Sequence, residues 1–246
     1  AALALADAEG YADTANQYLN RLHLALVNCF SHYAPDGAGY EGTDYWSYTM
    51  SGYLPYENAL YNSVGEADYP RFSILDEFGM EKTGDYILQM HGTTGLSFNY
   101  YDGAARGCYT AGDFWLARYF DRPELAGMAY EGAAGSLYYV LMYRPNEEYK
   151  NWRSAMPLDY TSGGEVQAGA MRTSFDKGNQ GFYVGYKGNG GNVASHGRLD
   201  AGTFVLDALG TRWVELLSSE DYNLPGMFGT QRYKYYRNRA EGSNTL

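Results

Sequence analysis

The sequence predicts an α+β fold in which helices come first and antiparallel strands follow. Up to residue 143, apolar side chains recur at steps of three and four, the spacing of one helix face. From Met156 onward, short runs of β-forming residues are separated by Gly or Asn, as in strands joined by turns. Because segregated helices and strands favour separate layers or domains, we expect a helical domain in residues 1–150 and a β domain in residues 151–246.

The first predicted helix covers residues 11–33. A loop rich in Pro, Asp and Gly follows at residues 34–39, and the next helix begins near Tyr45. Thr43 or Asp44 can cap that helix, because short polar side chains accept hydrogen bonds from first-turn amides. The apolar face of the first helix consists of Ala15, Leu19, Leu22, Leu26 and Phe30. The aromatic residues expected at the mouth of the second helix are Tyr45, Trp46 and Tyr48.

Helical spacing returns at residues 53–64, 73–80, 110–119 and 123–143. For the last of these, Asp121 is a candidate cap, and Pro123 suits the first turn, where no amide hydrogen is needed. Residues 96–102 form a run too short and polar for a core helix, which predicts an extended loop over the helices. The positions of the last helix expected to face inward are Ala133, Leu137, Val140 and Leu141.

The stretch from Ser195 to Trp213 combines a strand-turn-strand pattern with several polar side chains. Leu209-Gly210 supplies the turn, while His196, two carboxylates and two arginines gather at one end of an apolar strand. A functional site is expected at such a place, although a lone histidine beside a glycine is more often structural. The predicted strands of the whole β part are residues 168–175, 181–187, 202–208, 212–217 and 232–239.

Composition limits the class of partner. The chain has 246 residues, 45% of them hydrophobic, as is ordinary for a globular core. Its 27 tyrosines and 4 tryptophans suit the faces of polar ligands such as sugars, although most of them are expected to pack in the core. A net charge of −11 argues against nucleic acid and anionic membrane surfaces, because the field of the protein repels both. An anionic sugar in a locally basic cleft stays compatible with this charge.

The ends of the chain and its cysteines give further expectations. No apolar run of 18 residues and no signal-peptide pattern are found. The Ala-rich start reads like a helix already under way, so we expect a segment of a longer protein. Cys29 and Cys108 could form one disulfide or none.

Five stretches, in order along the chain, carry a family resemblance. They are Pro35-Asp-Gly-Ala-Gly-Tyr-Glu-Gly-Thr-Asp-Tyr-Trp-Ser-Tyr, Lys82-Thr-Gly-Asp-Tyr, Ser97-Phe-Asn-Tyr, Ser195-His-Gly-Arg-Leu-Asp-Ala-Gly-Thr-Phe-Val-Leu-Asp and Glu241-Gly-Ser-Asn-Thr-Leu. Together they make the chain resemble the heparinase II/III-like polysaccharide lyases. The resemblance implies an incomplete α/α toroid of helical hairpins followed by an antiparallel β-sandwich. It also implies β-elimination on an acidic, uronate-containing polysaccharide or oligosaccharide, and a periplasmic or secreted location.

The resemblance also assigns site residues. β-Elimination needs a base for the C5 proton, an acid for the leaving oxygen and a group that neutralises the uronate carboxylate. The family's tyrosine maps onto Tyr45, with Tyr48 as runner-up, and its histidine onto His196, each acting as base or acid. The neutralising group should precede Tyr45 by more residues than this chain has. The substrate-binding candidates are Glu41, Trp46, Tyr48, Asn99, Tyr100, Arg106 and Arg198, and a plain surface loop is an equal alternative for residues 99, 100 and 106.

The family's zinc positions differ in this chain. They read Arg198, Glu215 and Ser243, and because an arginine cannot ligate zinc, we predict neither zinc nor another cofactor. A charge-assisted pair between Arg198 and Glu215 could replace the ion.

Two other functions stay open. A non-catalytic carbohydrate-binding relative would tolerate the loss of Tyr45 or His196. A toroidal glycoside hydrolase would need two opposed carboxylates, and Glu41 and Asp44 are too close in sequence to be convincing. A homodimer is left open as well.

Overall fold

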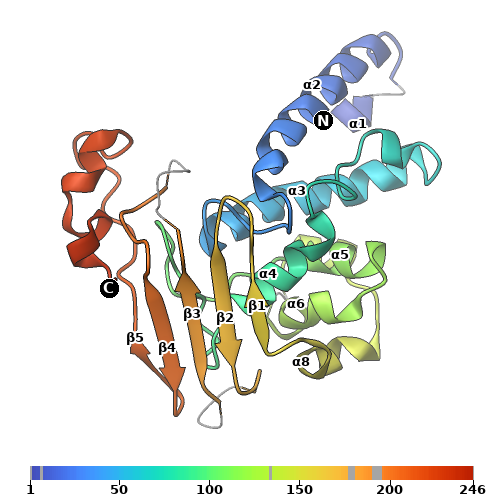
Figure 1. The fold of residues 1–246 in the computed structure, drawn as a ribbon. Coiled ribbons are helices and arrows are strands. Elements are labelled where there is room, and N and C mark those ends of the chain that lie inside the picture. Colours follow the sequence, from blue (N-terminus) through green and yellow to red (C-terminus); the bar gives the residue numbers. More distant parts are fainter. Residues whose placement is uncertain (1, 6–7, 133–134, 177–180, 190–195, 246) are drawn as a thin grey trace.

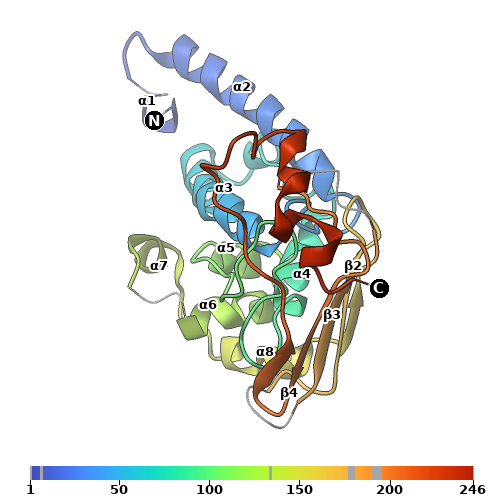
Figure 2. The same ribbon diagram turned by 90° about the vertical axis from the view of Figure 1, so that its left-hand side faces the viewer.

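The computed structural model describes residues 2–5, 8–132, 135–176, 181–189 and 196–245. In this part of the chain, eight α-helices precede one five-stranded antiparallel sheet, so the α+β class is confirmed (Figure 1). Figure 2 shows the helices on one face of the sheet. The described residues form a single sheet, and the finer expectation of a toroid followed by a sandwich stays a prediction, as does the division into two domains.

Short 3₁₀ turns join many of the helices. The α-helices are α1 (Ala2–Leu5), α2 (Ala12–Phe30), α3 (Thr43–Val64), α4 (Thr83–Gln89), α5 (Asp113–Tyr119), α6 (Gly127–Gly132), α7 (Leu137–Met142) and α8 (Trp152–Ala155). No helix of the described residues is both long and apolar enough to cross a membrane.

Helices α2 and α3 lie where the spacing predicts them, but α3 is longer and is capped differently. It includes residues 53–64, which the sequence predicts as a separate helix, and continues through Pro55. Its N-cap is Gly42, with a positive φ of 94°, and no side chain caps it. Thr43 and Asp44 do not cap because their oxygens bind elsewhere, to Phe98 O and to Ala104 N.

Two of the helix predictions are wrong. Residues 73–80 form turns, and residues 123–143 divide into a 3₁₀ turn, α6 and α7, since glycines at 127, 132 and 135 weaken a continuous helix. Asp121 has a φ of +52° and is not the cap of this segment. Leu137, Val140 and Leu141 are exposed, at 71%, 72% and 51%, and Ala133 lies outside the described residues.

The sheet has the simple order β1-β2-β3-β4-β5. Leu209 and Gly210 form a two-residue turn between β4 and β5 with φ values of 53° and 75°, which confirms the predicted hairpin. The predicted strand at 232–239 is wrong, because this segment folds into 3₁₀ turns. The strands are β1 (Asp159–Thr161), β2 (Ala168–Arg172), β3 (Tyr183–Lys187), β4 (Phe204–Ala208) and β5 (Thr211–Val214).

The segment at 96–102 contradicts its prediction as a surface loop. Phe98, Asn99, Tyr100 and Tyr101 are fully buried. Arg212, from β5, donates hydrogen bonds to the carbonyls of residues 96 and 97, so the backbone polar groups of the segment are satisfied although water is excluded. The segment is therefore part of the core, and it ends at Asp102. Cys29 and Cys108 are both free.

Candidate active site

The carboxylate of Asp102 is the centre of the candidate site. Its side chain is fully buried and lies within hydrogen-bonding distance of four side chains. Arg232 Nη2 is 2.6 Å from Oδ2, and Arg198 Nε is 3.3 Å from Oδ1. His196 Nδ1 and Tyr222 Oη lie 3.2 and 3.1 Å from Oδ2. Two buried guanidinium groups thus share one carboxylate.

The backbone before Asp102 is held against the sheet. Tyr101 has a φ of +58°, which is uncommon for a bulky residue, and its amide donates to Asp200 Oδ2 over 3.1 Å. Asp200 in turn pairs with Lys187 of β3 at 2.8 Å, and both side chains are buried. The sheet therefore fixes the position of Asp102.

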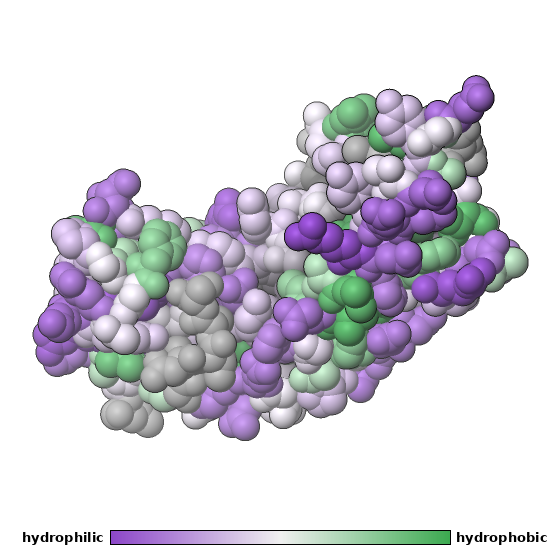
Figure 3. Space-filling view, turned by 90° about the horizontal axis from the view of Figure 1, so that it is seen from above, coloured by the Kyte–Doolittle hydropathy of each residue, from purple (hydrophilic) through white to green (hydrophobic). Residues whose placement is uncertain are grey.

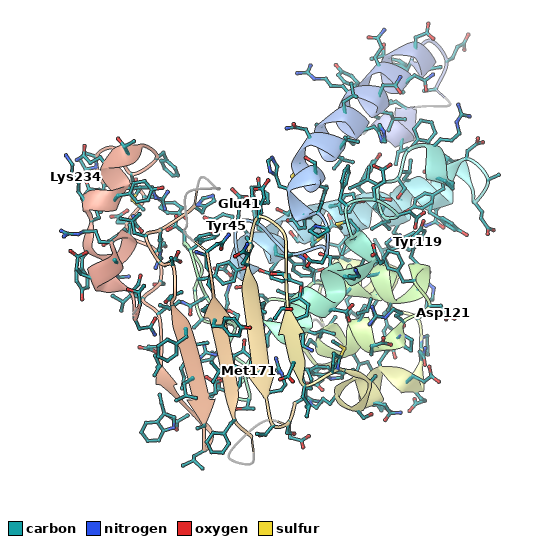
Figure 4. The ribbon with its side chains drawn as sticks, viewed as in Figure 1. Glu41, Tyr45, Tyr119, Asp121, Met171 and Lys234 are labelled. Carbon is teal, nitrogen blue, oxygen red and sulfur yellow. The ribbon has the colours of Figure 1, made fainter. Side chains whose placement is uncertain are left out.

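Tyr45 reaches the site from the first turn of α3. The next residue, Trp46, is fully buried and donates its indole Nε1 to Thr83 Oγ1 over 2.8 Å. Because this anchor fixes the rotation of the helix, the half-buried Tyr45 side chain is held beside the C-terminal part of the chain. Figure 4 shows Tyr45 and Glu41 above the end of the sheet, between α3 and the C-terminal segment. Seen from above, the outline of the molecule is indented between its two ends (Figure 3).

The rings of Tyr45 and His196 stack against each other. Their centroids are 3.6 Å apart and their planes differ by 14°. Tyr45 Oη lies 2.5 Å from Tyr222 Oη, and Tyr222 donates its only hydroxyl hydrogen to Asp102. Tyr45 must then be the donor to Tyr222. Tyr45, Tyr222 and Asp102 therefore form a directed chain of hydrogen bonds beside the His196 ring.

The local charges set the protonation of these groups. Burial favours the neutral form of Asp102, but hydrogen bonds from His196 and Arg232, with the charges of both arginines, outweigh it and lower its pKa. Burial, with the negative charges of Asp102, Asp44 and Glu41, raises the pKa of Tyr45. The pKa of Tyr222 is raised for similar reasons. At neutral pH, Asp102 is an anion whose Oδ2 lies within hydrogen-bonding distance of His196 Nδ1, while Tyr45 keeps its proton.

A surface pocket of about 390 Å³ lies along α3 from Tyr45. It is lined by Tyr48, which is 77% exposed, and by Arg106, whose guanidinium pairs with Asp44. Of the sequence-predicted substrate contacts, these two are the residues that face open space at this pocket. Glu41 is half-buried at the start of α3.

Four other predicted substrate contacts have side chains that are buried and hydrogen-bonded within the protein, and their role in binding stays a prediction. Trp46, Asn99 and Tyr100 have no exposed surface, and Arg198 is 2% exposed. Asn99 donates to Leu216 O, and the hydroxyl of Tyr100 bonds that of Tyr86 at 2.5 Å. In this structure these residues pack within the core beneath the candidate site.

The positions of the family's zinc ligands do not fit a zinc ion. Arg198 is a charged donor bound to Asp102 and Leu217 O, and it does not pair with Glu215, whose side chain is exposed. The expected Arg198–Glu215 pair is therefore wrong. The Ser243 hydroxyl lies 3.4 Å from Arg239 O. Among the described residues, no three His, Cys, Asp or Glu side chains converge as metal ligands.

Three site residues have no signal in the sequence pattern. Asp102 ends a run that reads as a loop, and Tyr222 follows a polar stretch without periodicity. Arg232 falls within a segment predicted as a strand. Each joins the site through contacts with distant parts of the chain, which local patterns do not contain.

Comparisons with known proteins support the fold. No family model matches the sequence, and no curated protein matches it. A solved structure of heparinase III is similar to this chain, with a TM-score of 0.54 and 16% sequence identity. The similarity covers 94% of this chain and 32% of the heparinase III chain. The chain therefore has a heparinase-like fold and spans about a third of the length of that protein.

Proposed function

We propose that this chain carries acid–base residues of a polysaccharide lyase that cleaves a uronate-containing polysaccharide by β-elimination. The observation that supports the proposal is the stacked contact between Tyr45, from the helical part, and His196, from the β part, beside the buried Asp102. A heparinase-like fold agrees with this class of reaction.

The hydrogen bonds favour one assignment of roles. We propose that Asp102 Oδ2, 3.2 Å from His196 Nδ1, holds the ring hydrogen on that atom, so that Nε2 faces the substrate. We assign His196 as the base that removes the C5 proton. Tyr45, which keeps its proton, donates it to the glycosidic oxygen as the bond from that oxygen to C4 breaks and the C4–C5 double bond forms. Arg106 in the adjoining pocket is the candidate partner of the uronate carboxylate.

The stacking limits how Tyr45 and His196 can approach a sugar. Ring centroids 3.6 Å apart leave no room for a sugar between Tyr45 and His196, so the two cannot face each other across the ring in this conformation. Both groups would act from the same face of the sugar. This geometry suits uronates whose C5 hydrogen and C4 oxygen lie on one face, as in glucuronate, and disfavours the C5 epimer, iduronate.

A carbohydrate-binding protein without catalysis is the second candidate. One observation favours it: the Tyr45 hydroxyl is already engaged by Tyr222, while Tyr48 beside it is open to solvent. Such a protein would need the pocket and would not need the acid–base pair.

The test is the ultraviolet absorbance of the unsaturated uronate product. The protein is incubated with glucuronate-rich and iduronate-rich glycans, alginate and bacterial exopolysaccharides. We expect an absorbance rise on glucuronate-containing chains that Tyr45→Phe abolishes and Tyr48→Phe retains. Sugar binding without any absorbance rise, unchanged in Tyr45→Phe, would favour the binding protein.

A further inference from the structure

A second, larger pocket opens at the other end of α3. Its volume is about 510 Å³, and its walls come from the last turns of α3, the 3₁₀ turn Tyr69–Arg71, and α5. Asn58 of this pocket follows Tyr45 by thirteen positions on one helix, which places the two about 20 Å apart. Figure 4 shows Tyr119, another wall residue, on the helical side of the molecule, away from Tyr45. The pocket is therefore separate from the candidate active site.

Two arginines without acidic partners line this pocket. Within the described residues, no carboxylate lies within ion-pair distance of Arg118 or Arg144, although the chain as a whole carries a net charge of −11. Arg118 donates to a neutral acceptor, Asn58 Oδ1, over 3.0 Å, and its Nε is buried without a partner. Arg144 donates to the carbonyls of Leu141 and Tyr143.

The two guanidinium groups influence each other. Burial, together with the positive charge of Arg144, lowers the pKa of Arg118. Glu66 also lines the pocket but pairs with neither arginine, and Asp76 is bound by the hydroxyl of Tyr119. A bound anion would relieve the repulsion between the arginines and supply the missing charged acceptor.

The remaining walls suit a sugar ring. Tyr61 stands edge-on to Trp115, the rings of Trp115 and Tyr119 are tilted by 32°, and the Arg118 guanidinium lies 5.1 Å from the Trp115 ring. Aromatic faces contact the C–H surfaces of sugars, and the amides of Asn58 and Asn62 can serve hydroxyl groups. A guanidinium group recognises a carboxylate or sulfate with two parallel hydrogen bonds.

We propose that this pocket is a second saccharide-binding site, which takes an acidic sugar residue and holds its carboxylate or sulfate with Arg118 and Arg144. Such a site would retain a polymeric substrate on the protein without taking part in its cleavage. The proposal does not depend on the lyase activity.

The test measures binding of a glucuronate-containing tetrasaccharide to the full chain by titration calorimetry, in a Tyr45→Phe background that prevents turnover. A neutral tetrasaccharide of the same length and sodium sulfate are the matched ligands. Arg144 is exposed, so Arg144→Ala leaves the fold intact, and we expect it to weaken binding at least tenfold. Arg71→Ala, an exposed arginine paired with Asp68 near the same pocket, is the control and should bind as the parent does.

Three other outcomes would overturn the proposal, and a fourth separates this site from the proposed lyase. Equal binding to the parent and to Arg144→Ala would place all saccharide at the candidate active site. Equal binding of the neutral tetrasaccharide would remove the role of the arginines, and sulfate binding as tight as that of the sugar would make this a simple anion site. Arginine-dependent binding together with a failed elimination assay would retain this site and reject the proposed lyase.

Discussion

Arg232 and Asp102 form a buried ion pair, with 2.6 Å between Nη2 and Oδ2, although 130 positions separate them in the sequence. The pair ties the C-terminal 3₁₀ segment to the buried loop between α4 and α5. Because Asp102 also holds Arg198, His196 and Tyr222, the same contact contributes both to stability and to the geometry of the candidate site.

We expect Asp102→Asn to destabilise the protein by about 3–5 kcal/mol, because it leaves two buried guanidinium groups without a counter-charge. Urea unfolding followed by tryptophan fluorescence measures the change. Asp68→Asn, which breaks an exposed pair with Arg71, is the control and should cost less than about 1 kcal/mol. Equal losses in the two variants would contradict the central role of Asp102.

The Asp102 carboxylate should also make the stability of the fold depend on pH in the acid range. The folded-state pKa of Asp102 lies below its ordinary value of 3.8, so folding favours the ionised form. The stability contributed is complete above the unfolded pKa and is lost as pH falls below about 4, through the folded pKa. The unfolding free energy of Asp102→Asn should therefore fall less steeply than that of the parent in this acid range.

The buried carboxyl of Asp113 should make the free energy of unfolding depend on pH in the opposite direction, at higher pH. Burial raises its pKa from 3.8 to about 7, against hydrogen bonds from Thr110 that lower it. Between these values the folded state binds more protons than the unfolded state, so stability decreases as pH rises from about 4 to 7. The free energy of unfolding lost across this pH range is on the order of 4 kcal/mol.

Asp113→Asn tests this prediction, because the amide oxygen can still accept from the Thr110 amide while carrying no charge. We expect the variant to be more stable than the parent at pH 8 and to lose the slope between pH 4 and 7, measured by urea unfolding across this range. Asp121→Asn, with an exposed side chain, is the control. A parallel pH dependence in parent and Asp113→Asn would exclude Asp113 as its source.

Tyr222 is predicted to position Tyr45. Tyr222→Phe removes the acceptor of the Tyr45 hydroxyl and one donor to Asp102. Since one such hydrogen bond is worth about 1 kcal/mol, we expect kcat/KM for glycan elimination to fall about fivefold to tenfold. The pH profile should also shift, which loss of stability alone would not cause. Tyr235→Phe, which loses a hydrogen bond to Pro225 O in the same segment, should keep the parent's profile.

Replacement by alanine should change the stability of the fold in opposite directions at two glycines. Gly210 has a φ of +75° in the β4–β5 turn, so Gly210→Ala is expected to cost about 1 kcal/mol. Gly52 is exposed within α3 and has open space around it, so Gly52→Ala should stabilise by about 0.5–1 kcal/mol. Thermal unfolding of the two variants measures the two changes in stability. A change of the same sign in both would show that the backbone conformation of the glycine does not determine the change.

Local sequence patterns predict the elements that have one buried face and one exposed face. Helix α2 and the Leu209-Gly210 hairpin agree with the sequence because period and turn residues determine them. Helix α4 escapes prediction because almost all of its residues are buried, so no polar face marks its period. Residues 96–102 look like a loop, yet Arg212 and other distant donors satisfy their backbone and permit burial.

Part of the candidate site could likewise be predicted from the sequence, and part could not. Tyr45 and His196 are selected by the family resemblance, and the structure brings their rings into contact. Their roles stay a prediction. Asp102 could not be selected from sequence, because its importance lies in four contacts with residues far along the chain.

Tyr45 precedes α8 and His196 follows β3, so the two residues can be separated by dividing the chain into two fragments. A cut in the chain between Ala155 and Asp159 would leave the phenol on one fragment and the imidazole on the other. Under the lyase proposal, neither fragment would contain both acid–base groups, so turnover recovered on mixing the fragments would report their reassociation. Under the lyase proposal, the two fragments together would form a sensor in which catalytic activity reports their assembly.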